Sequence, residues 1–85
     1  MSIHIEWSIR AVRQLLRLER RDQRRIRKAV HKLYGFPATA NVRHLVNHSP
    51  PYRLRVGNHR VLFSFDDTLR LIIIEAVRKR DDHTY

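Results

Sequence analysis

The residues best suited to chemistry in this sequence are three arginines around one short turn. Arg53 and Arg55 alternate with apolar residues, and Arg60 follows shortly after Gly57-Asn58, a pair typical of two-residue hairpin turns. With that turn, Arg55 lies opposite Arg60, and Arg53 lies on the same face of the hairpin. Guanidinium groups stay charged and match phosphate or carboxylate in geometry, so this cluster predicts an anion-binding surface.

Two interpretations of the cluster differ in what the arginines do. Like charges directly opposite each other destabilise a sheet, which favours an anion bound between them. Alternatively, the long side chains splay apart and are solvated on an open sheet face. A one-residue shift of register would also move all three arginines to the other face. The anion site therefore depends on Gly57-Asn58 forming the turn.

The histidines in the middle of the chain are weaker candidates for a functional site than the arginines. His44 and His48 have the i, i+4 spacing that could bind zinc on a helix, but their stretch resembles a loop and lacks cysteine or carboxylate. His59 alternates to the face opposite Arg60, where a turn or edge role is more usual. We therefore expect no bound metal.

Charge is the strongest feature of the composition. Eighteen Lys and Arg against eight Asp and Glu give a net charge of +10, with histidines neutral. Such a charge on a small body attracts polyanions, which favours nucleic acid or the ribosome, together with an acidic protein, over an anionic membrane. The acidic pair Asp66-Asp67 is typical of a turn, and Asp81-Asp82 balances the basic residues before it.

The remaining composition indicates a cytoplasmic protein of one domain. The 85 residues contain no cysteine, so neither disulfides nor thiolate chemistry is expected. No apolar run approaches the ~20 residues that span a bilayer, and the first residues lack the basic-then-apolar order of a secretory signal. We expect a single domain over residues 1–85, without a cofactor or membrane contact.

The elements that must position the arginines are predicted in the order β-α-α-β-β-β. Residues 3–7 alternate between apolar and polar and predict the first strand, after which Ser8 suits a helix N-cap. Three more strands are expected over residues 52–56, 59–65 and 69–77. Two N-terminal helices packed on a curved, mainly antiparallel sheet make an α+β fold.

Both helices are predicted to be amphipathic, and the second spans roughly residues 22–34. Gly35-Phe36-Pro37 ends it, because Gly suits a helix C-terminus and Pro cannot continue the helix. Residues 38–51 are predicted to be a connecting loop. The expected buried stripes are Ile9, Val12, Leu15 and Leu16, with Leu18 at the margin, and then Ile26, Ala29, Val30 and Leu33.

Three stretches of the second half resemble the RelE/ParE toxin superfamily. The run Tyr-Arg-Leu-Arg-Val-Gly-Asn-His-Arg-Val-Leu-Phe, residues 52–63, resembles the YRLRVGDYRVLY stretch common in that family. Asn-Val-Arg-His-Leu at residues 41–45 is similar to the V-K-x-L that precedes it. Residues 76–85 are similar to the V-G-H-R-R-x-x-Y ending. Length and element order match as well, so the resemblance spans the whole chain.

The resemblance to the RelE branch implies an mRNA interferase that acts in the ribosomal A site and is neutralised by an acidic, RelB-like antitoxin. In that branch, two basic residues of one strand, an arginine of the next, a tail arginine and a tail tyrosine serve the cleavage. These roles carry over to Arg53, Arg55, Arg60, Arg80 and Tyr85.

The implied reaction uses the 2′-hydroxyl of RNA and gives a 2′,3′-cyclic phosphate without a metal. Arg60 and Arg80 would stabilise the phosphorane charge, and Arg53 and Arg55 would bind the flanking backbone. The type member of the family has lysines at these two positions, whereas arginine stays protonated above about pH 12 and is a poor base. His83 is then the candidate base or acid, since histidine titrates near neutral pH and some relatives use tail histidines in this role.

Two other functions stay open. ParE-like members of the superfamily inhibit DNA gyrase without a nuclease site, and a non-catalytic nucleic-acid-binding module would carry the same charge. The full set of arginines together with His83 and Tyr85 favours the nuclease. The basic faces of the helices are expected to be solvated, or to dock on ribosomal RNA or the antitoxin.

Overall fold

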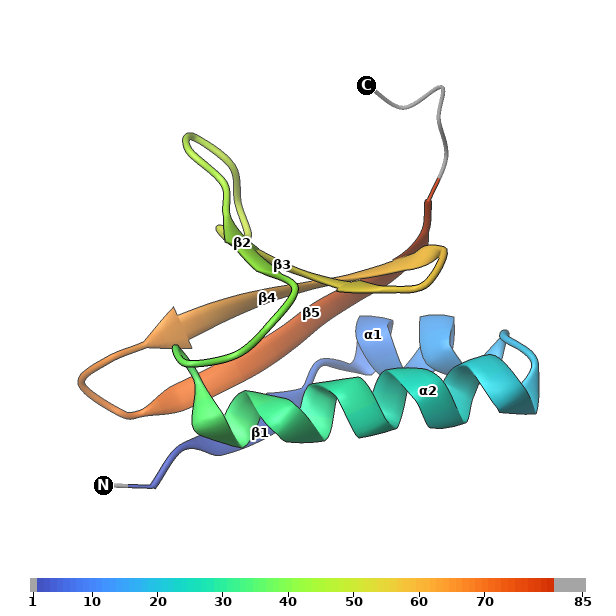
Figure 1. Cartoon of the computed structure of the whole chain (residues 1–85), viewed down its shortest axis with the longest axis horizontal. Helices are drawn as coiled ribbons and strands as arrows, with labels where there is room; N and C mark the ends of the chain where they lie inside the picture. The colour runs from blue at the N-terminus through green and yellow to red at the C-terminus, as the bar shows by residue number, and fades with distance from the viewer. Residues whose placement is uncertain (1, 81–85) are drawn as a thin grey trace.

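A five-stranded sheet organises the chain, and the computed structural model describes residues 2–80 (Figure 1). The strand order is β1-β5-β4-β3-β2, in which β1 pairs with β5 in parallel and all other neighbours are antiparallel. The predicted α+β class is confirmed. The strands are β1 (His4–Trp7), β2 (Val42–His44), β3 (Tyr52–Val56), β4 (His59–Asp66) and β5 (Leu71–Lys79).

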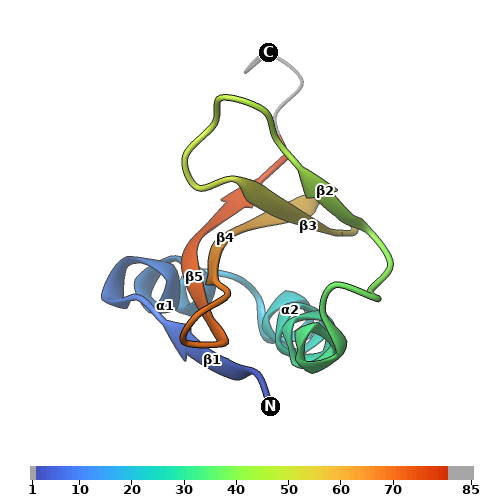
Figure 2. The same cartoon turned by 90° about the vertical axis from the view of Figure 1, so that its left-hand side faces the viewer.

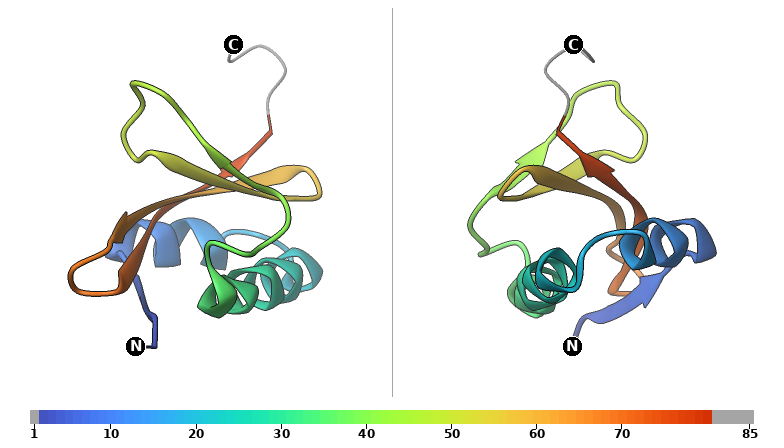
Figure 3. Two further views of the ribbon diagram at one scale, coloured as in Figure 1. Left: turned by 60° about the vertical axis from the view of Figure 1, so that its left-hand side comes forward. Right: turned by 90° about the vertical axis from the view of Figure 1, so that its right-hand side faces the viewer.

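Helix α2 lies under one side of this sheet, α1 lies along strand β5, and the other side is left open to the loop between β2 and β3 (Figures 2 and 3). Helix α1 (Ile9–Leu16) begins at the predicted N-cap, where the Ser8 hydroxyl accepts a hydrogen bond from the Ala11 amide at 3.0 Å. Helix α2 (Arg20–His31) continues into a 3-10 turn, η1 (Lys32–Gly35). The predicted stop at Gly35-Phe36-Pro37 is therefore confirmed.

The buried stripe of α1 differs from the prediction. Leu15 is buried as expected, but its buried companion is Ala11, which is 0% exposed. In so short a helix two apolar stripes overlap, and packing on β5 decides between them. A small residue at that contact lets the helix approach the strand, whose Val77 amide donates to Gln14 Oε1 at 2.7 Å. The expected core residues that are exposed instead are Ile9 (71%), Val12 (38%) and Leu16 (59%).

The remaining core follows the predicted pattern. Ile26, Val30 and Leu33 of α2 and η1 are buried in one core with residues of the sheet, and Ala29 and Leu18 pack partly buried against this core. Phe36 caps this core with edge-to-face contacts to three other rings. Burial on the helix side thus uses one face of the sheet, and the strands are left free to present different residues on the other.

The β3–β4 hairpin has the predicted register. Val56 pairs with His59 and Arg55 with Arg60 around Gly57-Asn58, and Gly57 adopts a φ of +57°. Leu54, Val56, Val61 and Phe63 are buried on the helix side, as the alternation predicts. The anion-site hypothesis therefore rests on a hairpin that forms as expected.

The prediction of a loop over residues 38–51 is wrong for Val42–His44, which form strand β2 at the edge of the sheet. Only three residues pair, and their partner is β3, about ten residues away: Val42 lies opposite Leu54 and Arg43 opposite Arg53. Three residues give too short an alternation to stand out in the sequence. Pairing with β3 is what makes them a strand.

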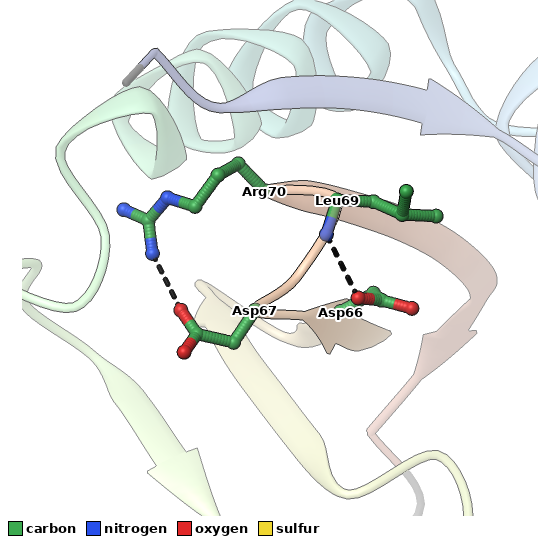
Figure 4. A network of polar contacts seen from close by, with 4 residues as sticks. All are labelled: Asp66, Asp67, Leu69 and Arg70. Atoms are coloured by element: carbon green, nitrogen blue, oxygen red, sulfur yellow. Dashed lines mark hydrogen bonds and ion pairs between the residues drawn. The ribbon is translucent and has the colours of Figure 1, made fainter.

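The β4–β5 pair contains an irregularity and a self-contained turn. Leu62 pairs with Ala76 and Phe63 with Ile74, so Glu75 is the extra residue of a β-bulge. At the turn, the Asp66 carboxylate accepts a hydrogen bond from the Leu69 amide at 2.9 Å, and Asp67 pairs with Arg70 at 2.7 Å (Figure 4).

Neither helix among residues 2–80 has the length and apolar character that a membrane-spanning helix requires.

Candidate nucleic-acid interface

Five arginines share the open face of the sheet, and we call this surface the arginine face. Arg43 lies opposite Arg53 across β2 and β3, on the side away from the partly buried Val42 and the buried Leu54. A second row crosses three strands, because Arg60 pairs with Arg55 on one side and with Arg78 on the other. Neighbouring strands lie about 4.8 Å apart, so the positive charges are closely packed. The arginine face comprises Arg43, Arg53, Arg55, Arg60 and Arg78.

Four of these five guanidinium groups have no carboxylate partner among residues 2–80. Over residues 2–80, Arg43, Arg53, Arg55 and Arg78 form no ion pair with a carboxylate within 4.0 Å. Like charges opposite each other cost stability in a sheet, and here three such pairs occur: Arg43 with Arg53, Arg55 with Arg60, and Arg60 with Arg78. Several adjacent arginines without carboxylates form a surface suited to a chain of phosphates.

A polar hollow adjoins the arginine face and shares Arg78 with it. Its volume is about 240 Å³, and it lies between the loop that follows β2 and the bulged part of β5. The paired side chains Leu62 and Ala76, which are 8% and 3% exposed, form its apolar part. The residues that line it are Arg10, His48, Ser49, Pro50, Leu62, Glu75, Ala76 and Arg78.

His48 is the titratable side chain that the loop brings to this hollow. Its Nδ1 lies 2.7 Å from the Pro50 carbonyl oxygen. His44, four residues earlier, packs its ring 4.9 Å from Tyr52 and belongs to the paired strand β2. The two histidines therefore do not share a helix, and no group of three metal-ligating side chains occurs among residues 2–80.

The predicted site residues fall into two groups. Arg53, Arg55 and Arg60 lie together on the arginine face. Arg80 follows β5 directly, and its amide donates to the Asn58 carbonyl at 2.6 Å, which puts it beside the β3–β4 turn. His83 and Tyr85 lie outside the described residues.

His59 lies on the helix side of the sheet, opposite to Arg60, as predicted. It is 8% exposed and lines a second, mixed-charge hollow of about 370 Å³ at the end of the hairpin. The side chain of Arg25 covers the turn there, so closely that a Cβ on Gly57 would lie 3.0 Å from its guanidinium nitrogen. His59 is thereby separated from the arginine face by the sheet itself.

Sequence reasoning missed two arginines and the hollow. Arg43 was assigned to a loop because β2 was not predicted. Arg78 lies just beyond the strand predicted over residues 69–77, although the alternation of buried Val77 with exposed Arg78 would have extended β5 to Lys79. No local signal marks the hollow, because His48 and Glu75 meet only through the folded sheet.

Comparisons with known proteins agree with this architecture. A family model of the ParE toxin of the type II toxin–antitoxin system parDE matches residues 5–83. No curated protein sequence matches the chain.

Solved structures of low sequence identity share the fold. The toxin–antitoxin complex RelBE2 from Mycobacterium tuberculosis matches with a TM-score of 0.79 and 19% identity, over 94% of this chain and 100% of that one. The archaeal RelE–RelB complex from Pyrococcus horikoshii OT3 matches with a TM-score of 0.73 and 20% identity, over 96% and 99%. A mutant of the E. coli toxin RelE in the free state gives 0.73 and 16%, over 98% and 88%.

The match to the family model covers nearly the whole chain, and so does each of the three structural matches. What the solved structures share with this chain is the fold, in which two helices pack on a mainly antiparallel sheet. This chain belongs to the RelE/ParE superfamily and is a toxin of the type II toxin–antitoxin class.

Proposed function

We propose that this toxin is a metal-independent endoribonuclease that cleaves mRNA, in the ribosomal A site, and so inhibits translation. The observation that carries the proposal is the arginine face, where two rows of guanidinium groups lie on the open side of a rigid sheet. Single-stranded RNA presents a run of phosphates to such a surface. Messenger RNA as the substrate would put the protein in the cytoplasm.

The reaction needs no group that the chain lacks. The 2′-oxygen attacks the adjacent phosphorus, the bond from phosphorus to the 5′-oxygen breaks, and the products are a 2′,3′-cyclic phosphate and a 5′-hydroxyl. Arg60 and Arg80 are assigned to the phosphorane charge, and Arg53 and Arg55 to the flanking phosphates. Because the attacking oxygen is the 2′-hydroxyl, DNA cannot be cleaved in this way.

Proton transfer is assigned to two residues at the end of the chain, which lie outside the described residues. His83 is proposed as an acid or base, and Tyr85 as a group that stacks on a nucleobase or assists the transfer. Arg43 and Arg78 extend the set of phosphate-binding arginines beyond the sequence-based one.

We also assign an acidic antitoxin as the partner that restrains the toxin. Several similar structures are complexes of RelE with RelB. Besides its net charge of +10, this chain has an apolar groove of about 360 Å³ with Arg27 at its side, which suits an amphipathic acidic segment. The apolar lining includes Ile5, Trp7, Val12, Leu16 and Tyr34.

The antitoxin assignment has a direct test. Leu16→Glu puts a carboxylate into the groove and is expected to abolish copurification with the cognate antitoxin. Ile9→Glu changes the same helix outside the groove lining and is the matched control. Equal loss, or no loss, in both variants would assign the antitoxin to another surface.

A second function is favoured by one observation, the match to a model of the ParE toxin of the parDE system. In this alternative the chain inhibits DNA gyrase and has no nuclease activity. Brief induction in cells distinguishes the two. Translation arrest with new mRNA 5′ ends, before any DNA-damage response, supports the ribonuclease, whereas a DNA-damage response with intact transcripts overturns it.

A further inference from the structure

The proposed cleavage lacks a base among the described arginines, because guanidinium groups remain protonated at any pH at which RNA is handled. The hollow beside the arginine face contains a side chain that can take this role. We propose that His48 is the general base that removes the proton from the 2′-hydroxyl. This inference rests on the proposed ribonuclease function and adds a catalytic residue to it.

The hydrogen bond of His48 decides which ring nitrogen can accept a proton. Nδ1 lies 2.7 Å from the Pro50 carbonyl oxygen, and a carbonyl oxygen can only accept a hydrogen bond. Nδ1 must therefore carry the hydrogen. In the neutral imidazole the lone pair is then on Nε2, which is the form that a general base requires.

The surroundings of His48 suit a fragment of an RNA chain. The hollow measures about 240 Å³, somewhat below the ~300–1,000 Å³ of drug-sized ligand sites, and so fits a small part of a polymer. Leu62 and Ala76 offer an apolar wall, and the shared Arg78 connects the hollow to the rows of phosphate-binding arginines. A ribose in the hollow would keep its phosphate beside the arginine face.

The charged groups that face His48 come from both packed elements. Arg10 belongs to α1, and Glu75 and Arg78 belong to β5. Glu75 is the extra residue of the β-bulge, a common device for re-aiming a side chain next to a site. Two cations and one carboxylate give the hollow a net positive charge, which favours a phosphate near the ring.

The step balances without any further reactant. Nε2 takes the proton of the 2′-hydroxyl as the 2′-oxygen bonds to phosphorus, and the 5′-oxygen leaves and takes a proton from the acid, for which His83 is the candidate. The imidazolium then releases its proton to solvent. The two histidines would divide the roles of base and acid, and the arginines would hold the charge between them.

His48→Gln tests the inference cleanly, because a glutamine amide can still donate to the Pro50 carbonyl while offering no titratable nitrogen. We expect single-turnover RNA cleavage to fall about 100-fold or more, and the remaining activity to lose the rise with pH that a histidine base produces. His44→Gln is the matched control, because the His44 ring packs on Tyr52 and does not line the hollow, and it should leave rate and pH profile unchanged. For His48→Ala, added imidazole should restore part of the rate.

Each outcome separates the two levels of the proposal. If the wild-type chain cleaves RNA and His48→Gln does so within threefold and with the same pH profile, His48 is not the base, although the chain is still a ribonuclease. If the wild type does not cleave, the ribonuclease proposal itself fails. Histidine ¹⁵N NMR of the intact chain gives a readout without RNA: a hydrogen on Nε2 of His48 in the neutral ring overturns the inference.

Discussion

Two regions of this molecule use charge in opposite ways. At the turn between β4 and β5, Asp66 accepts the Leu69 amide and Asp67 pairs with Arg70 (Figure 4). The Arg70 guanidinium also lies 5.2 Å from the centre of the Phe65 ring. Every charged group named there has a partner within four residues or on the adjacent strand. On the arginine face, like charges lie opposite each other, and four of the five arginines form no ion pair within residues 2–80.

The difference teaches which charges are internal to the fold. A turn must satisfy its own exposed amides and carboxylates, so residues of opposite sign lie close in sequence. On the arginine face, Arg43, Arg53, Arg55 and Arg78 form no ion pair within residues 2–80, and polar, uncharged residues at these opposed positions would make the strand pairs more stable. An array of like charges that costs stability in the free protein supports the proposal that an anion binds there.

The largest effect is expected from arginines of the arginine face and the residue that follows β5. Arg60→Ala and Arg80→Ala should each lower the cleavage rate about 100- to 1,000-fold, because each removes a cationic donor from the phosphorane. The measurement is single-turnover cleavage of mRNA on programmed ribosomes. Arg70→Ala, which removes the paired arginine of the turn, is the control and should leave cleavage unchanged.

That comparison breaks if the three variants behave alike. Equal losses in all three variants would mean that net charge alone governs the reaction. If Arg60→Ala and Arg80→Ala both cleave at the wild-type rate, neither arginine stabilises the phosphorane charge.

The next largest effect is expected on RNA binding, and it distinguishes Arg43 of the arginine face from Arg70 of the turn. Arg43→Ala should weaken binding of single-stranded RNA and reduce the slope of log affinity against log salt by about 0.7, the contribution of one phosphate contact. Arg70→Ala should leave the slope unchanged. Fluorescence anisotropy with a labelled oligonucleotide between low and physiological salt measures both, and an unchanged slope for Arg43→Ala would exclude that arginine from the interface.

The sequence predicted the parts of this comparison that depend on neighbours in the chain. Gly57-Asn58 fixed the register of β3 and β4, because the turn and both strands lie within fifteen residues, and Arg53, Arg55 and Arg60 followed from it. The turn at Asp66-Asp67 was equally local.

Features that depend on distant contacts could not be predicted. Arg43 joins the arginine face only because β2 pairs with β3. The buried stripe of α1 is chosen by β5, more than sixty residues away, through contacts such as that of Gln14 with Val77. The hollow likewise needs the loop, α1 and β5 together. His83 and Tyr85 stay predictions.

A smaller effect is expected on stability, where removal of an arginine should raise the free energy of unfolding rather than lower it. Arg55→Thr removes one member of the opposed pair with Arg60 and replaces it with a good strand former, so the free energy of unfolding should rise by about 0.2–1 kcal/mol at low salt. In 1 M salt, where charges are screened within about 3 Å, most of the gain that is due to charge should vanish. Denaturant unfolding at the two salt concentrations measures this, and a loss of stability at low salt would contradict the view that the face is strained by its own charge.

The smallest effect is expected at the turn, with the opposite sign. Asp67→Asn removes the ion pair with Arg70, whose partners are 83% and 28% exposed, and should lower the free energy of unfolding by no more than about 1 kcal/mol at low salt. Asp66→Asn is the matched control: it changes the net charge equally, but its side-chain oxygen can still accept the Leu69 amide. The difference between the two variants in denaturant unfolding therefore isolates the ion pair from the general repulsion of a chain of charge +10. Equal destabilisation by both would mean that the turn, too, is governed by net charge, and the contrast between the turn and the arginine face would then be lost.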